Sequence, residues 1–256
     1  MIDGLKRRAE KASRWAQWRF RPGQKSSNSY SGVFSTFAQA RAAIGDHVGF
    51  DSKVGAALYR EKLDRLAPED YPLLFWLQPI APSVKRVFDF GGHVGLHYYA
   101  FRERLAFAPG LTWTVSDVDA VMDEGRALAQ SREASALRFE GGFGGAEGAD
   151  VMISSGALQY LEAPALLDAL RNLKVMPRML LLNKLPVAEG KGFVTVQDAW
   201  TFKAPYTVFS RPQLLADLQS LGYRLKDSWH NQGHHCLVFR RPEISVEVFS
   251  GFCFER

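Results

Sequence analysis

The sequence predicts an α/β protein with a doubly wound, seven-stranded and mostly parallel sheet whose last strand is antiparallel. Two observations predict this fold class. Five short apolar segments alternate with helical segments from residue 85 onward, a pattern typical of a parallel sheet with helices on both faces. Two further strand-like segments with a turn between them follow, and a hairpin requires one of its strands to run antiparallel.

The first strand, Val87–Phe90, is apolar except for Asp89, and a carboxylate so close to the core needs a partner. Three glycines follow at Gly91, Gly92 and Gly95, and the next helix is predicted over Leu96–Arg104. A glycine turn between a strand and a helix lets backbone N–H groups approach a ligand closely. The spacing G-G-x-x-G lacks the middle glycine of the dinucleotide fingerprint, which disfavours a nicotinamide-dependent oxidoreductase.

Asp117 lies at the carboxyl end of the second predicted strand, Leu111–Asp119. Ligands bind at the carboxyl ends of parallel strands, and a carboxylate there can accept hydrogen bonds from both hydroxyls of a ribose. The alternative is that Asp117 caps the helix starting near Val121, a role that Asp119 serves equally well. We therefore predict that Asp117 binds a ribose. The remaining parallel strands are Ala136–Glu140, Asp150–Ile153 and Met179–Leu182.

The second half of the chain is expected to insert a segment and then complete the sheet. Residues 190–206 lack a helical period and are predicted to lie over the carboxyl edge of the sheet. Ser210-x-x-Gln213 is a capping box that starts a helix. Tyr223–Trp229 and His235–Arg240 are then predicted as the last two strands, with a hairpin turn at 231–233. The segment Ile244–Phe254 adds an edge strand.

The part of the chain before the first strand divides into a basic segment, 1–29, and a helical cap, 30–82, ahead of the nucleotide-binding domain, 83–256. Residues 1–21 carry seven basic and two acidic residues, an excess equal to the whole net charge of +5. The rest is near neutral, so no nucleic-acid partner is expected. The basic segment is interpreted as a solvated helix or as a peripheral contact with an anionic membrane.

Composition indicates an ordinary globular enzyme, with 46% hydrophobic and 23% charged residues. The two cysteines have no paired spacing, so neither a disulfide framework nor a zinc site is expected. No cluster of carboxylates suggests a metal. No apolar run approaches the ~18 residues that span a bilayer, and no signal peptide is evident. The predicted location is therefore cytoplasmic, and the alternative is peripheral contact with the inner face of the membrane.

The run DFGGHVG, 89–95, resembles the first motif of Rossmann-like (class I) S-adenosylmethionine-dependent methyltransferases. Residues 154–161 match the fourth motif of that family, beside the transferable methyl group. The resemblance implies S-adenosylmethionine as cofactor, with the acidic residue and the glycine loop facing its amino-acid part. Tyr160 is implied to line the reaction centre, or alternatively to pack. The cofactor-binding residues are then Asp89, Gly91, Gly92, Gly95, Asp117, Ser155 and Gln159.

Five local patterns are similar to a narrower methyltransferase family, that of bacterial surface-polysaccharide (O-antigen and capsule) gene clusters. They are SGVFSTFAQA (31–40), VFDFGGHVGLHYY (87–99), ALQYL (157–161), FVTVQ (193–197) and GYRLKDSW (222–229). The match runs from about Tyr30 to Trp229. It implies O- or N-methylation of a small, sugar-linked acceptor in polysaccharide biosynthesis.

Methyl transfer from a sulfonium is an in-line displacement, so alignment of acceptor and methyl group is the protein's main contribution. A hydroxyl acceptor benefits from a general base. His97 and His230 are the predicted catalytic histidines, with His234 as a further candidate and His93 as a cofactor contact; each is alternatively a surface or core histidine. A non-catalytic scaffold that keeps the fold is the alternative function, and a nicotinamide-dependent oxidoreductase is the less favoured one.

Overall fold

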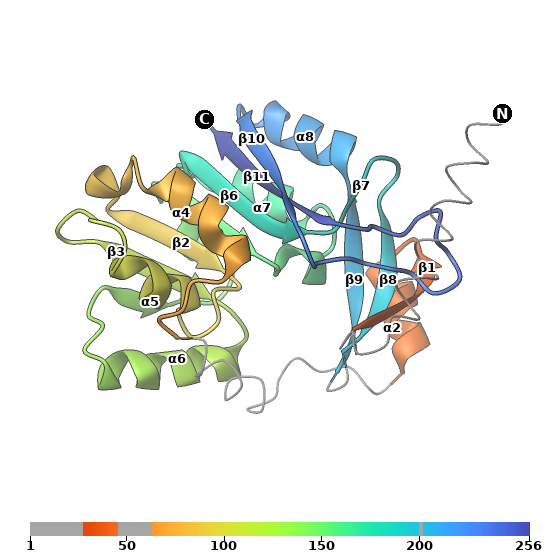
Figure 1. The fold of residues 1–256 in the computed structure, drawn as a ribbon, viewed down its shortest axis with the longest axis horizontal. Coiled ribbons are helices and arrows are strands. Elements are labelled where there is room, and N and C mark those ends of the chain that lie inside the picture. Colours follow the sequence, from red (N-terminus) through yellow and green to blue (C-terminus); the bar gives the residue numbers. More distant parts are fainter. Residues whose placement is uncertain (1–27, 46–62, 200–201) are drawn as a thin grey trace.

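The structure, a computed structural model, describes residues 28–45, 63–199 and 202–256. Its centre is a seven-stranded sheet, here called the main sheet, with strand order β10-β11-β6-β5-β2-β3-β4 (Figure 1). Strands β2 to β6 are parallel, and β11 is antiparallel to both of its neighbours, which confirms the predicted fold class. The strands are β2 (Arg86–Phe90), β3 (Thr112–Ser116), β4 (Leu137–Phe139), β5 (Val151–Ser155), β6 (Met179–Leu185), β10 (Arg224–Asn231) and β11 (Phe249–Glu255).

Helices cover both faces of the main sheet because its central strands are apolar on both sides. Val87 packs into a core with side chains of α4, α5 and α6, whereas Phe88 packs into a second core with α7 and α8. The helices are α4 (Tyr71–Leu77), α5 (Leu96–Arg102), α6 (Asp119–Ser131), α7 (Ala165–Arg171) and α8 (Arg211–Ser220). Short 3₁₀ turns are η2 (Pro68–Asp70), η3 (Ala81–Ser83), η4 (Gly144–Ala146) and η5 (Leu158–Tyr160).

A second sheet of four strands, here called the cap sheet, has the order β1-β8-β9-β7. Its strands are β1 (Ser29–Phe34), β7 (Val187–Ala188), β8 (Phe193–Asp198) and β9 (Lys203–Ser210). Helix α2 (Phe37–Ile44) packs on it through Phe37, Ala40 and Ile44. The cap sheet lies beside the carboxyl ends of the parallel strands (Figure 1), where β9 contacts η5. The predicted insertion over this edge is confirmed.

Local sequence signals account for several helix boundaries. Thr36 Oγ1 accepts a hydrogen bond from Gln39 N at 3.2 Å at the start of α2, and Ser210 Oγ accepts one from Gln213 N at 3.4 Å at the start of α8. The helix start predicted at Ser210 is therefore confirmed as an N-cap, although the Gln213 side chain donates to Asp217 Oδ1 and does not complete a capping box. Residues 1–27 of the basic N-terminal segment and residues 46–62 of the predicted helical cap lie outside the described residues.

Three expectations about strands need correction. The segment His235–Arg240 is not the last strand of the main sheet: Cys236 and Val238 bridge to Val246 and Tyr30 and are buried with residues of the cap sheet. The last strand is β11, and it lies inside the sheet between β6 and β10 rather than at its edge. The predicted helical cap also contains a strand, because β1 pairs with β8 far along the chain. Short alternating segments do not reveal which sheet they join.

Candidate functional site

The glycine corner, defined as residues 91–95, connects β2 to α5 at the carboxyl edge of the main sheet. Gly91 has φ +71°, and its N–H donates to the Ser116 carbonyl at the end of β3, at 2.7 Å. A Cβ at Gly91 would overlap the Cβ of Ala157 in the segment after β5. The corner is therefore packed against two neighbouring strand ends, and a side chain there would separate them.

His93 stands in the glycine corner with φ +56°, a left-handed backbone that non-glycine residues rarely adopt. Its N–H donates to Asp117 Oδ2 at 3.0 Å. This bond joins the corner to the end of β3. Strained backbone of this kind persists where surrounding contacts hold it, and it is concentrated at functional sites.

Asp117 lies just past the end of β3, half-buried, as the sequence predicts for a ribose-binding carboxylate. Its Oδ1 accepts a hydrogen bond from Val118 N at 2.8 Å. Burial raises the pKa of Asp117, and the backbone N–H groups of Val118 and His93 oppose that rise only in part. Helix α6 has no side-chain cap, so the alternative capping role of Asp117 is not seen.

Asp89 has protein partners of its own rather than an open face toward a ligand. It is fully buried in β2, with His97 Nδ1 at 3.0 Å from Oδ2 and Trp113 Nε1 donating to the same oxygen at 3.3 Å. A Cβ at Gly92 would lie 2.5 Å from its carboxylate, so the carboxylate sits directly against the glycine corner. Direct contact of Asp89 with a cofactor, as predicted, does not fit this burial; Asp89 supports the corner from behind.

His97 lies in α5 between two carboxylates, Asp89 and Asp70, with Nε2 at 3.8 Å from Asp70 Oδ1. Burial lowers the pKa of His97, but the two carboxylates outweigh that effect and raise it to about 10. The imidazole is therefore a cation at neutral pH. A general base must be neutral to accept a proton, so the catalytic role predicted for His97 does not fit its position.

The charge on His97 makes stability depend on pH. Its folded pKa of about 10 exceeds the unfolded value of 6.5, so its contribution is fully present below about pH 6.5 and is lost as the pH rises through about 10. We expect the free energy of unfolding, measured with urea, to fall more steeply between pH 7 and 10 for the wild type than for His97→Gln. Parallel curves for the two proteins would refute a buried imidazolium.

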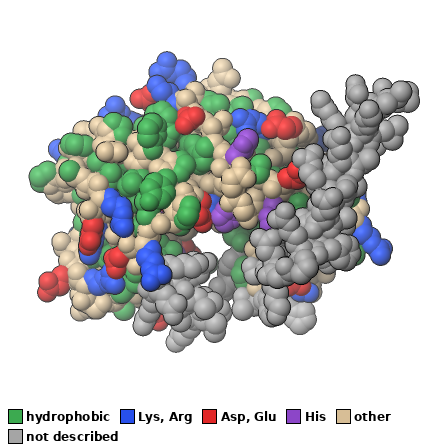
Figure 2. Space-filling view, viewed as in Figure 1, with side chains coloured by type: hydrophobic (Ala, Val, Ile, Leu, Met, Phe, Trp, Pro, Cys, Tyr) green, Lys and Arg blue, Asp and Glu red, His purple; other side chains and the backbone are tan. Residues whose placement is uncertain are grey.

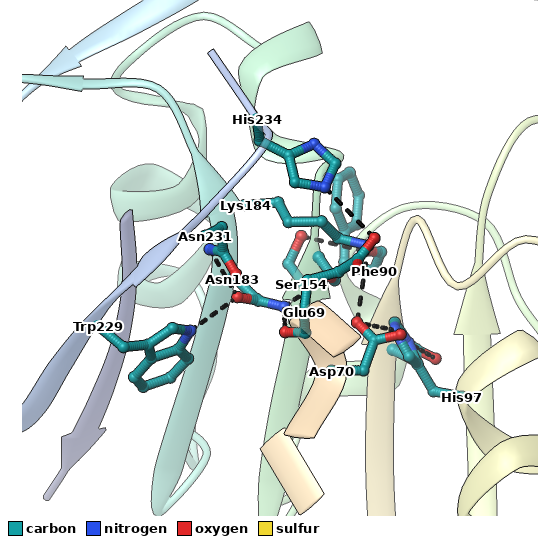
Figure 3. A network of polar contacts seen from close by, with 12 residues as sticks. Glu69, Asp70, Phe90, His97, Ser154, Asn183, Lys184, Trp229, Asn231 and His234 are labelled. Carbon is teal, nitrogen blue, oxygen red and sulfur yellow. Dashed lines mark hydrogen bonds and ion pairs between the residues drawn. The ribbon is translucent and has the colours of Figure 1, made fainter. Parts of the chain in front are cut away.

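Asp70, in η2, continues the pattern of alternating charges. Lys184 Nζ lies 3.6 Å from its Oδ1, and Figure 3 shows His97, Asp70 and Lys184 in sequence. With Asp89 on the other side of His97, these side chains form a row of charges from β2 to β6. Burial raises the pKa of Asp70, but His97 and Lys184 more than compensate and hold it below its usual value. Asp70 Oδ1 has these two ion pairs but no hydrogen-bond partner among the described residues.

Asn183, near the end of β6, joins four elements through hydrogen bonds (Figure 3). Its Nδ2 donates to the Glu69 carbonyl at 2.9 Å and to Ser155 Oγ at 3.1 Å. Its Oδ1 accepts from Trp229 Nε1 at 2.9 Å and from Asn231 Nδ2 at 3.0 Å. Asn183 thereby fixes η2 over the carboxyl ends of β5 and β6. Sequence reasoning missed it; the only signal was a polar Asn-Lys pair after a buried strand.

The other predicted residues separate into two groups. Ser155 and Gln159 lie at the same edge as the glycine corner, and a Cβ at Gly156 would meet Gln159 Nε2 and the Lys184 side chain at about equal distance. Gln159 is buried, and its Oε1 has no hydrogen-bond partner among the described residues. Tyr160 instead faces the cap sheet, where its hydroxyl donates to Gln197 Oε1 at 2.8 Å.

The predicted His230 is exposed on the edge strand β10. Its neighbours Trp229 and Asn231 both reach Asn183, so the side chain of His230 points to the opposite face of the sheet. That orientation does not suit a catalytic role at the glycine corner. His234 instead contacts the turn η2, with Nε2 at 3.3 Å from Glu69 Oε1. Figure 2 shows histidine side chains gathered beside a hollow between the main sheet and the cap sheet.

The described residues hold no group of three or more histidine, cysteine or carboxylate side chains that could bind a metal ion. Among the described helices, none has both the length and the apolar character needed to cross a bilayer.

No protein-family model matches the sequence, and no curated protein matches it. Solved structures match in fold. One is Burkholderia thailandensis 1,6-didemethyltoxoflavin-N1-methyltransferase with bound 1,6-didemethyltoxoflavin and S-adenosylhomocysteine, 18% identical over 79% of this chain and 82% of that one, with a TM-score of 0.53. Another is the CcbJ methyltransferase from Streptomyces caelestis, 12% identical over 82% and 98% of the two chains, with a TM-score of 0.51. The chain therefore has the fold of class I S-adenosylmethionine-dependent methyltransferases.

Proposed function

We propose that this protein transfers a methyl group from S-adenosylmethionine to a small, sugar-linked acceptor, as an O- or N-methyltransferase. One observation carries the proposal: the glycine corner and Asp117 meet at the carboxyl edge of neighbouring strands, joined by the bond from His93 N to Asp117. In an open parallel sheet this edge is where nucleoside-type ligands bind. The fold matches methyltransferases over most of the chain.

The residues present fit such a cofactor. Its ribose offers hydroxyl donors, which suit the half-buried carboxylate of Asp117. Its amino-acid end offers an ammonium donor, and two buried acceptors at this edge, Asp70 Oδ1 and Gln159 Oε1, lack hydrogen-bond partners among the described residues. When bound, the cofactor supplies an electrophilic methyl group on a sulfonium. The glycine corner, Asp117 and Gln159 would hold it, and Ser155 shapes the same edge.

The cap sheet is the natural support for an acceptor because it faces this edge. Tyr160 and Tyr30 are joined through Gln197, whose Oε1 accepts from Tyr160 and whose Nε2 donates to the Tyr30 hydroxyl at 3.3 Å. The Tyr160 and Tyr206 rings meet edge to face, with centroids 5.3 Å apart. Tyr30, Tyr206 and Gln197 are buried, so they support the half-buried ring of Tyr160, and an aromatic face of this kind suits a polar, ring-shaped acceptor. Tyr160 would then position the acceptor rather than remove its proton.

A role in surface-polysaccharide biosynthesis, in the cytoplasm, is part of the proposal. It is supported by the resemblance of the patterns at 31–40 and 193–197 to that methyltransferase family. These two patterns pair with each other in the cap sheet, where Ser31 is opposite Val196. They therefore form one structural unit next to the proposed acceptor site. Residues that are specific to a family are expected there, because they contact the acceptor of that family.

A non-catalytic module with this fold is the second candidate. Its support is that neither predicted catalytic histidine suits a general base: His97 is a buried cation and His230 points to the other face of the sheet. Transfer of a radiolabelled methyl group from S-adenosylmethionine to small molecules of a cell extract would exclude this candidate. Cofactor binding without any transfer would favour it.

Calorimetric titration with S-adenosylhomocysteine tests the proposed function directly. We expect saturable binding with one site per chain, and no comparable binding of reduced nicotinamide dinucleotide. Absence of binding at millimolar S-adenosylhomocysteine would contradict the proposal. Preference for the nicotinamide nucleotide would point to an oxidoreductase instead.

We expect Asp117→Asn to weaken S-adenosylhomocysteine binding about tenfold or more, because hydrogen bonds to a charged group contribute about 1.5–3 kcal/mol. Binding of 5′-methylthioadenosine, which keeps the ribose, should weaken equally. Asp119→Asn is the matched control: Asp119 is an exposed carboxylate two residues away, in the first turn of α6, and its loss should change either affinity less than twofold. Equal effects of the two substitutions would argue against a ribose contact.

A further inference from the structure

We propose that Asp70 and Lys184 hold the amino-acid end of the cofactor, with Asp70 accepting a hydrogen bond from its ammonium and Lys184 pairing with its carboxylate. The inference rests on the proposed function and deepens it. It assigns the contact to the turn η2 and to the carboxyl-terminal half of β6, and not to Asp89 in β2, where the motif resemblance places it. The hydrogen-bonding capacity, the exposure and the charge of these side chains support it.

Hydrogen-bonding capacity favours Asp70 over Asp89. Asp89 Oδ2 lies within hydrogen-bond distance of both His97 Nδ1 and Trp113 Nε1. Asp70 Oδ1 has only ion pairs, at 3.8 Å to His97 and 3.6 Å to Lys184, and no hydrogen-bond partner among the described residues. A buried carboxylate oxygen without a donor is an incomplete site, and an ammonium supplies up to three donors. Gln159, whose side chain lies with that of Lys184 beside Gly156, has an Oε1 that also lacks a hydrogen-bond partner among the described residues.

Exposure increases along the row of charges and shows from which end a ligand can reach it. The side chain of Asp89 is 0% exposed, that of His97 9%, that of Asp70 11% and that of Lys184 20%. The Lys184 end is therefore the accessible one. Lys184 also has φ +54°, a strained backbone that directs its side chain from the end region of β6 toward η2 (Figure 3).

The charges of the row suit a zwitterion. Two carboxylates, Asp89 and Asp70, alternate with two cations, His97 and Lys184, so the row is neutral as a whole at neutral pH. An amino-acid group carries one ammonium and one carboxylate and adds no net charge. It can extend the alternation, because its ammonium meets Asp70 while its carboxylate meets Lys184. A simple cation next to Asp70 would be repelled by Lys184, and a simple anion next to Lys184 would be repelled by Asp70.

The test compares binding of S-adenosylhomocysteine with that of 5′-methylthioadenosine, which shares the nucleoside but lacks the amino-acid end. We expect Asp70→Asn and Lys184→Met each to weaken binding of S-adenosylhomocysteine tenfold or more. Binding of 5′-methylthioadenosine should change less than twofold. Glu69→Gln is the matched control on the same turn: it removes a carboxylate whose partner is His234, and both affinities should stay within twofold of the wild type.

The outcomes separate this inference from the proposed function. If the wild type binds S-adenosylhomocysteine and both substitutions leave its affinity unchanged, the inference is wrong and the proposed function stands. If both ligands weaken equally, the residues act on the fold and not on the amino-acid end, which also overturns the inference. Thermal unfolding of each variant shows whether such a loss is general. If the wild type binds neither ligand, the proposed function fails and this inference fails with it.

Discussion

Replacing Asp89 by alanine is expected to destabilise the protein by about 3–5 kcal/mol, because it leaves the buried cation His97 without its closest partner. The Trp113 indole N–H loses its acceptor in the same step. Since the Asp89 carboxylate also sits against Gly92, the glycine corner should lose its shape and S-adenosylhomocysteine binding should be lost. Urea unfolding followed by circular dichroism measures the first effect, and calorimetry measures the second.

Two further variants test whether the loss of stability comes from the buried ion pair of Asp89 and His97. Asp227 is an exposed carboxylate that also accepts a hydrogen bond from an indole, Trp76 Nε1, at 3.2 Å. Asp227→Ala should cost less than about 1 kcal/mol, since exposed polar contacts contribute little. Combining Asp89→Ala with His97→Leu removes both partners and should restore part of the lost stability. A single Asp89→Ala variant as stable as Asp227→Ala would refute the buried ion pair.

Gly91→Ala is expected to weaken S-adenosylhomocysteine binding at least tenfold and to destabilise the fold by more than about 1 kcal/mol. Two causes act together: φ is +71°, and the new Cβ would overlap Ala157 Cβ after β5. The loop must then move away from the strand end it packs against. Chemical unfolding and calorimetry on the same preparation measure the two effects.

Gly110→Ala separates these causes. Gly110 has a similar φ of +79°, but apart from its chain neighbours no atom of the described residues lies within 4 Å of the place its Cβ would take. It should therefore show only the cost of the backbone conformation and should leave ligand affinity within twofold of the wild type. Equal losses in the two variants would mean that the approach of Gly91 to Ala157 has no role in the site.

The fold was predictable because its signals are local and repeated. The apolar run at 87–90, the glycines after it and the capping residues Thr36 and Ser210 each determine structure within a few neighbours. The presence of an antiparallel strand at the end of the chain followed from the count of elements, but the place of β11 between β6 and β10 did not. The segment 235–240 was assigned to the wrong sheet because its alternation fits either sheet, and the choice depends on burial against Tyr30 and Tyr206, far away in sequence.

The candidate site was predictable in position but not in the partners of its charges. The glycine corner, Asp117, Ser155 and Gln159 lie at one edge, as strand order requires. The pairing of Asp89 with His97 and of Asp70 with Lys184 depends on how η2 lies over the strand ends, which no local pattern encodes. For the same reason the sequence suggested His97 as a base, although two carboxylates make it a cation.

Hydrogen–deuterium exchange with and without S-adenosylhomocysteine tests the central claim most directly, because it locates the bound cofactor on the chain. We expect slower exchange in peptides covering the glycine corner, residues 91–95, and the end of β3 at 116–118, where backbone N–H groups join the corner to Asp117. Exchange in α8, on the other face of the main sheet, should not change. Protection confined to other parts of the chain, with these two segments unchanged, would contradict the claim that the glycine corner binds the cofactor.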